Sequence, residues 1–132
     1  GDGAYVFGNP TASAWLAAAH DAPTLLVVYN NSGWNAVQSA TARQHPDGIA
    51  VANEVPESKF DPTFDLTAPA NAVDAYTAVV RDGDELMPAL KAGAEAVDGG
   101  RPAVVDVRIE PVEADAFSQR VRRSMAGVRE RQ

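Results

Sequence analysis

Apolar residues along this chain fall into short continuous runs separated by longer segments with helical spacing. Residues 24–29 are apolar without alternation, which is typical of a parallel strand buried on both faces. Residues 103–109 are the clearest other strand, and residues 77–80 predict a short third one. Three strands far apart in the sequence therefore need connections that cross over the sheet.

Helical patterns fill the spaces between these strands. Asn9 and Pro10 suit the N-cap and the first position of a helix that continues to about His20. Asp84 suits the N-cap of another helix, and Gly99-Gly100 ends it. Beyond the helix that starts at Pro10, helices are predicted at residues 34–43, 68–75, 85–97 and 113–130.

The alternation of helices and strands predicts an α/β fold, a mostly parallel sheet with helices on both faces. Residues 45–64 interrupt this order, because Pro, Gly, Asp and Glu replace the periodic pattern. We expect a long loop with some helical turns there, and such loops in compact domains usually belong to a functional site.

Two polar turns stand where ligands bind in such a sheet. Asn31 follows the strand at residues 24–29, and we expect Asp2 to follow a strand that precedes Gly1. Turns at the carboxyl ends of neighbouring parallel strands face one crevice. Carboxylate and amide oxygens suit Mg²⁺, and Gly1 and Gly3 allow the backbone to approach a diphosphate closely.

Gly1-Asp2-Gly3, a helix, a buried strand and Asn30-Asn31 together resemble the signature of thiamine-diphosphate (ThDP) enzymes, with 26 residues between the two halves. The resemblance covers residues 1–110 and implies the diphosphate-binding domain of the ThDP-binding fold. It implies Mg²⁺ ligation by Asp2, the Asn31 side chain and the Gly33 carbonyl. It also implies that Gly3 and Ala4 line the diphosphate.

The chain opens inside this signature. A natural domain rarely begins in a tight turn, so we expect a fold truncated at its N-terminus, in a fragment, a processed product or one piece of a longer chain.

Longer stretches of sequence resemble one group within the family. Residues 1–11 and 29–37 are similar to the acetolactate-synthase-like group, which includes benzoylformate decarboxylase and 2-hydroxyacyl-CoA lyase relatives. Pyruvate decarboxylases carry a catalytic acid six residues after the second Asn, where this chain has Val37. The apolar residue favours the acetolactate synthase side, although Ala36 replaces a larger residue often found beside it.

The resemblance implies a lyase or transferase that cleaves or forms C–C bonds next to a carbonyl, with small 2-oxo acid or 2-hydroxyacyl substrates. The glutamate that activates the cofactor is expected on a pyrimidine-binding domain outside this chain, so the chain alone is expected to be inactive. The family also implies a dimer or tetramer. The alternatives are a non-catalytic binding or assembly module with the same fold, and a phosphate-binding domain, although no Walker lysine or GxGxxG supports the latter.

Several candidate residues allow a second interpretation. Asp2 and Asn31 are also residues that stabilise local turns by hydrogen bonds to the backbone. Tyr5 and Trp34 either line the cofactor site or pack in the interior. His45 opens the long loop, where a solvated histidine is the simpler interpretation.

Composition narrows the class of protein further. A net charge of −7 argues against a nucleic-acid surface, and a bound diphosphate needs a metal ion or backbone N–H groups to offset its charge. No apolar run approaches the ~20 residues that span a bilayer, and there is no cysteine, which is compatible with the cytoplasm. Residues 111–132 carry five Arg against three acidic residues and form a basic tail.

Overall fold

The computed structural model describes residues 1–110, so the predicted helix in the basic tail lies outside the described residues. Its internal contacts divide the described chain into two units. The first consists of residues 1–31 and 62–109, and the second of residues 32–61 with Glu110. Each unit is described separately below.

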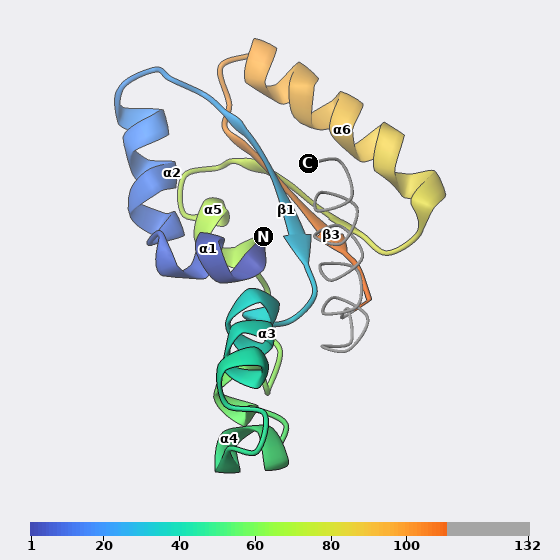
Figure 1. Cartoon of the computed structure of the whole chain (residues 1–132). Helices are drawn as coiled ribbons and strands as arrows, with labels where there is room; N and C mark the ends of the chain where they lie inside the picture. Colours follow the sequence, from blue (N-terminus) through green and yellow to red (C-terminus); the bar gives the residue numbers. More distant parts are fainter. Residues whose placement is uncertain (111–132) are drawn as a thin grey trace, which may run out of the picture. The chain divides into compact units, whose positions relative to one another are not determined.

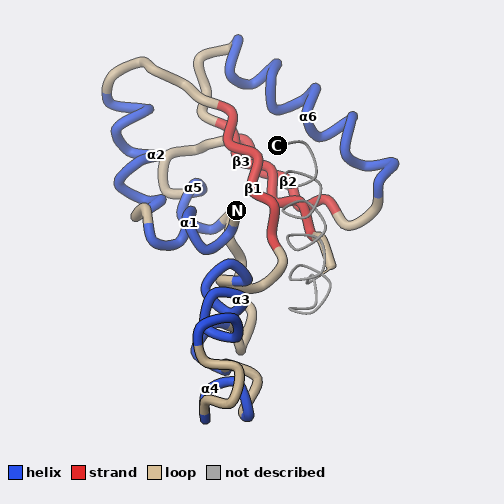
Figure 2. The backbone as a smooth tube through the Cα atoms, viewed as in Figure 1, coloured by secondary structure: helices blue, strands red, loops and turns tan. Residues whose placement is uncertain are grey.

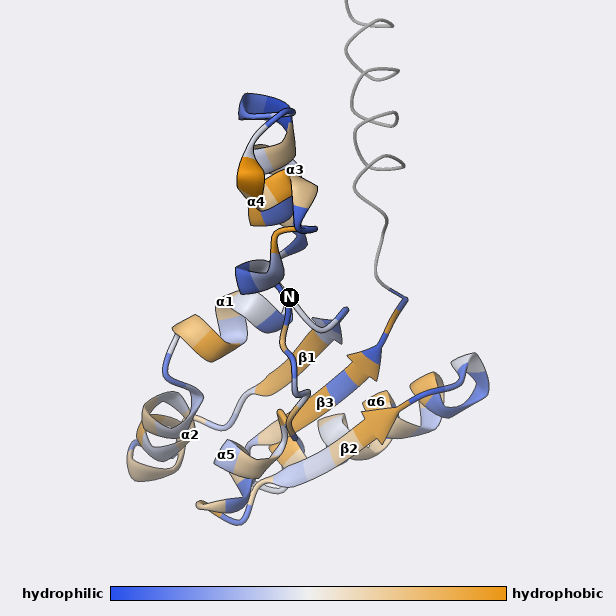
Figure 3. Ribbon diagram, turned by 90° about the horizontal axis from the view of Figure 1, so that it is seen from below, coloured by the Kyte–Doolittle hydropathy of each residue, from blue (hydrophilic) through white to orange (hydrophobic). Residues whose placement is uncertain are grey.

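The first unit contains a sheet of three parallel strands in the order β1-β3-β2, all of which are labelled in Figure 3. The strands are β1 (Leu25–Asn30), β2 (Tyr76–Val80) and β3 (Ala103–Arg108). Val105, in the centre of β3, is in register with Val27 of β1 and with Ala78 of β2. The predicted parallel α/β fold is therefore confirmed. The last strand in sequence lies in the middle of the sheet.

Helices cover both faces of this sheet (Figure 2). Helix α6 (Gly83–Asp98) lies on one face, over a cluster of Val80, Ala89, Val105 and Val107. Helices α1 (Asp2–Phe7), α2 (Pro10–Ala19) and α5 (Ala68–Asn71) lie on the other side of the sheet (Figure 1). The buried residues there are Val28, Leu66, Ala70, Ala75 and Val104.

Helix α6 approaches the sheet closely at Gly93. A Cβ atom added there would lie 2.8 Å from Cδ1 of Leu25 and 3.6 Å from Cγ2 of Val105. The absence of a side chain at this position lets the helix pack directly on the strands.

The second unit is built from short helices. It holds α3 (Asn35–Gln44), α4 (Ile49–Ala52) and the 3₁₀ helix η1 (Pro56–Ser58). The expectation of a long segment with some helical turns is confirmed for residues 45–61. Val55 is the buried apolar residue of this unit, with 7% of its surface exposed.

Three parts of the sequence prediction differ from the observed helices by more than one residue. The turn expected at residues 1–3 is instead the start of α1, which has an acidic residue in its first turn, where the helix dipole favours it. The helix expected at residues 68–75 ends at Asn71, and Asp74, in the turn that follows, has a positive φ of 53°. Helix α6 begins at Gly83, before the expected start, because the Glu85 carboxylate accepts hydrogen bonds from the N–H groups of residues 81 and 82.

None of the helices within residues 1–110 is long and apolar enough to cross a membrane.

Candidate functional site

Asp2 is a buried carboxylate beside the end of β1. Only 2% of its surface is exposed, and its Oδ1 accepts a hydrogen bond from the Gly3 N–H at 2.9 Å. Helix α1 packs against β1, and a Cβ added to Gly1 would lie 3.7 Å from the Tyr29 carbonyl oxygen. The first half of the sequence motif therefore lies next to the strand that leads into the second half.

The second half of the motif begins inside the strand. Asn30 is the last residue of β1 and is 3% exposed, and its carbonyl accepts a hydrogen bond from the Ile109 N–H at 2.9 Å. Asn31 follows directly and is half-buried. Burying Asp2 and Asn30 at the carboxyl end of β1 puts polar side chains where ligands bind in parallel α/β sheets.

The last two predicted site residues, Gly33 and Trp34, lie in the second unit. Gly33 is buried and forms an isolated antiparallel bridge with Lys59. The Trp34 ring meets the Phe60 ring edge-on, with 4.5 Å between centroids and an interplanar angle of 83°. The structure gives Trp34 a packing partner.

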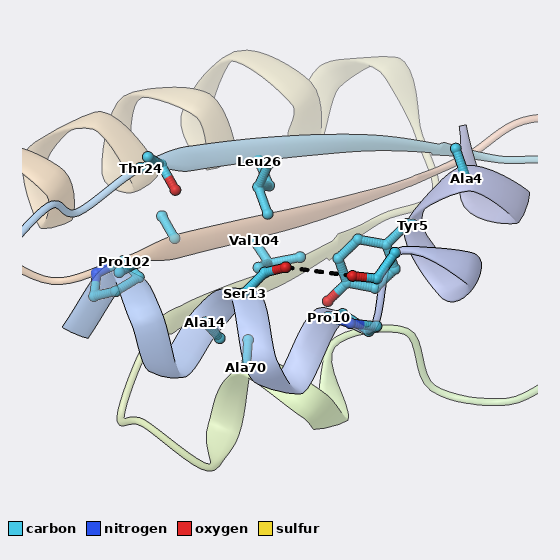
Figure 4. Close-up of a pocket in the computed structure, with 13 residues that line it drawn as sticks. Ala4, Tyr5, Pro10, Ser13, Ala14, Thr24, Leu26, Ala70, Pro102 and Val104 are labelled. Atoms are coloured by element: carbon cyan, nitrogen blue, oxygen red, sulfur yellow. Dashed lines mark hydrogen bonds between the residues drawn. The ribbon is translucent and has the colours of Figure 1, made fainter. Parts of the chain in front are cut away.

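Ala4 and Tyr5 border a cavity of about 290 Å³ on the first unit (Figure 4). Thr24 and Pro102, which precede β1 and β3, also line it, so the cavity extends toward the amino ends of these strands. Tyr5 is partly buried and packs against the cluster around Val104. Burial, and then the charges of Asp106 and Asp65, raise the pKa of Tyr5, so the phenol keeps its proton at neutral pH.

A buried ion pair in β3 is the polar feature that the sequence analysis did not identify. Asp106 is completely buried, and its Oδ2 lies 2.9 Å from Nη2 of Arg108. Neither carboxylate oxygen of Asp106 makes a hydrogen bond, and the Arg108 Nε is buried without one. Figure 3 shows hydrophilic residues interrupting the otherwise hydrophobic β3. The signal in the sequence is a charged pair two residues apart in an apolar strand, which places both on one face.

Asp65 adds to the charge near this pair. Its Oδ1 accepts hydrogen bonds from the Thr67 hydroxyl at 2.7 Å and the Thr67 N–H at 2.8 Å. These hydrogen bonds, helped by the positive charge of Arg108, lower the pKa of Asp65. The surroundings of Asp65 therefore favour its ionised form.

The available donors limit which metal ion this chain would suit. Within residues 1–110, no three His, Asp or Glu side chains gather closely enough to hold a metal ion. A cation near Asp2 would therefore need amide, carbonyl, phosphate or water oxygens beside the carboxylate. Mg²⁺ is bound in this way, through one or two carboxylates and the phosphates of its ligand.

Comparison with protein families agrees with this geometry. The model of the thiamine pyrophosphate enzyme C-terminal TPP-binding domain matches residues 1–107. Comparisons with curated proteins and with solved structures gave no significant match. The matched range includes both halves of the motif and all three parallel strands. The chain therefore belongs to the thiamine pyrophosphate enzymes, as their C-terminal TPP-binding domain.

Proposed function

We propose that this domain binds ThDP through Mg²⁺, with Asp2, Asn31 and the Gly33 carbonyl as the protein ligands of the ion. The observation that carries the proposal is the burial of Asp2 beside the end of β1, where the chain continues into Asn31. The acidic chain would otherwise repel a diphosphate, since its net charge is −7. A divalent cation offsets that repulsion.

The residues around Asp2 would accommodate the diphosphate. Gly1 and Gly3 allow close approach of the backbone, and Ala4 is exposed at the same helix. Tyr5 and Trp34 are proposed as neighbours of the cofactor on the strength of the family resemblance. The partial exposure of both side chains is compatible with that role.

We further propose that the complete enzyme cleaves or forms C–C bonds next to a carbonyl, on small 2-oxo acid or 2-hydroxyacyl substrates, in the manner of the acetolactate-synthase-like group. The bound cofactor supplies a nucleophilic carbon and holds the electrons released by bond cleavage. Val37, which is 53% exposed, offers no acid at the position that pyruvate decarboxylases use. The activating glutamate would come from a pyrimidine-binding domain, in a cytoplasmic dimer or tetramer.

Thermal unfolding of the complete enzyme tests the binding proposal. ThDP and Mg²⁺ together are expected to stabilise the protein by ~2.7 kcal/mol at a hundredfold excess over Kd, since a ligand of the native state favours that state. Either component alone is expected to give a much smaller shift. Asp2→Asn is the matched variant and is expected to abolish the stabilisation that depends on Mg²⁺. Equal stabilisation of wild type and Asp2→Asn would contradict the role of Asp2 as a ligand.

A further inference from the structure

We propose that Ser58 is a positioning residue for the metal site, because the segment Ser58–Phe60 holds the Gly33 peptide in place. The inference rests on the proposed function, in which the Gly33 carbonyl is a ligand of Mg²⁺. It adds a residue that is 25 positions away from Gly33 and belongs to neither half of the sequence motif. All the contacts that support it lie within the second unit.

Backbone hydrogen bonds fix the chain on both sides of Gly33. The Trp34 N–H donates to the Ser58 carbonyl at 2.7 Å, and the Phe60 N–H donates to the Ser32 carbonyl at 2.8 Å. Between these two bonds, Gly33 faces Lys59 in an antiparallel bridge. The direction of the Gly33 carbonyl is therefore set from across the bridge as well as by its own neighbours in sequence.

The two segments approach too closely for a side chain at position 33. A Cβ built on Gly33 would overlap the Ser58 carbonyl oxygen and lie 3.2 Å from the Lys59 Cα. These are backbone atoms, so no rotation of a side chain can relieve the clash. The glycine is required here by close approach.

Ser58 is itself fixed by a local turn. Its hydroxyl donates to the Val55 carbonyl at 2.7 Å, and its backbone N–H donates to the same oxygen at 3.0 Å. Only 4% of Ser58 is exposed, and Val55 has a positive φ of 47°. The buried hydroxyl donates to a residue whose backbone is in the left-handed conformation. This bond holds the Ser58 carbonyl where it accepts the hydrogen bond from the Trp34 N–H. Removing the hydroxyl loosens the turn and, through it, the Gly33 peptide.

The experiment measures how much Mg²⁺ the complete enzyme needs to bind ThDP. Calorimetric titrations of ThDP at a series of fixed Mg²⁺ concentrations give the apparent Kd for Mg²⁺. Ser58→Ala is expected to raise this Kd about tenfold. Gly33→Ala is expected to raise it a hundredfold or more, because the Ser58 segment must move away. The matched control is Ser39→Ala, since Ser39 is equally buried in α3 of the same unit.

The outcomes separate the inference from the function on which it rests. If the wild type binds ThDP without any dependence on Mg²⁺, the proposed metal site fails. If the wild type needs Mg²⁺ but Ser58→Ala and Ser39→Ala have the same Kd as wild type, the role of Ser58 fails alone. Unfolding midpoints without ligand show whether each variant is folded.

Should Ser58→Ala not fold, Ser58→Cys replaces it. This change keeps a side chain of similar size but weakens the hydrogen bond to the Val55 carbonyl, because a thiol is a poor donor. We expect a three- to fivefold higher Kd for Mg²⁺, and an unchanged Kd would overturn the inference.

Discussion

The two units of this domain are stabilised in different ways. The first unit buries Val105 and Leu66 almost completely, between a parallel sheet and its helices. The second unit buries Val55 together with the polar residues Ser39 and Ser58. Backbone hydrogen bonds between residues 32–34 and 58–60 join its parts. The comparison indicates that the first unit supplies most of the stability, while the second holds a proposed ligand by directional bonds.

The largest expected effect comes from breaking the ion pair in the first unit. Arg108→Met leaves the buried Asp106 carboxylate without its cation, so we expect a loss of about 3 kcal/mol in the free energy of unfolding. Urea denaturation measures this loss of stability. The double variant Asp106→Val/Arg108→Met removes both charges and is expected to recover most of the loss. A double variant less stable than Arg108→Met would contradict this account.

Truncation of an apolar side chain compares a buried position of the first unit with an exposed position of the second. Val105→Ala removes buried methyl groups from a completely buried position and is expected to cost about 2 kcal/mol. Ile49→Ala is the control in the second unit, because Ile49 is 84% exposed and its loss is expected to change stability by less than about 0.5 kcal/mol. Comparable losses for the two variants would contradict the expectation that burial of Val105 stabilises the first unit.

Hydrogen exchange tests the difference between the two units without any mutation. We expect the amides of β3 to exchange only through global unfolding, since β3 pairs with a strand on each side and is buried along nearly its whole length. Amides of α3 and α4 are expected to exchange at least about tenfold faster, by local opening of a region with little buried apolar surface. Bound ThDP and Mg²⁺ should slow the exchange of Trp34 and Phe60, whose N–H groups bond across the Gly33 bridge. Uniform protection throughout residues 1–110 would refute the distinction.

The smallest expected effect is a pH dependence at the start of α6. Hydrogen bonds from the N–H groups of Arg81 and Asp82 lower the pKa of Glu85, so its stabilising contribution is present above the ordinary glutamate pKa. The contribution is lost as the pH falls through the lowered value. Glu85→Gln should therefore lower the unfolding midpoint slightly at pH 7, and the difference from wild type should vanish in acid.

The matched control for this prediction is Glu95→Gln. Glu95 lies on the same helix, and its carboxylate is 3.9 Å from the ammonium of Lys91, with both side chains exposed. An exposed pair of this kind contributes little, so its removal should leave the midpoint nearly unchanged at both pH values. A difference between Glu85→Gln and wild type that persists in acid would contradict the role of the ionised carboxylate.

Local patterns were sufficient to predict most of the fold. The apolar run around Val27 and the Asn9-Pro10 helix start act through neighbours in sequence, and both elements lie within one or two residues of their expected bounds. Helix α1 was missed because its six residues are too few to show a periodic pattern. The family and its cofactor were recognised because the spacing between the two motif halves is itself a sequence property.

The features of the candidate site that the sequence did not predict depend on contacts between residues far apart in the chain. The bridge between Gly33 and Lys59 joins a motif to a segment whose composition only indicated a loop. The Asp106–Arg108 pair is visible as two charges in a strand, but its burial follows from the position of β3 between two other strands. Sequence periodicity assigns residues to elements, and it does not identify which elements become neighbours.

The central position of β3 has a consequence for how the chain is made. Within residues 1–110, β1 and β2 pair only with β3, which comes last of the three in the sequence. A growing polypeptide that has not yet reached residue 103 carries β1 and β2 without the strand that joins them. Such strands are the sites at which incomplete chains aggregate. The joining of these three strands into a sheet therefore waits until β3 has been synthesised.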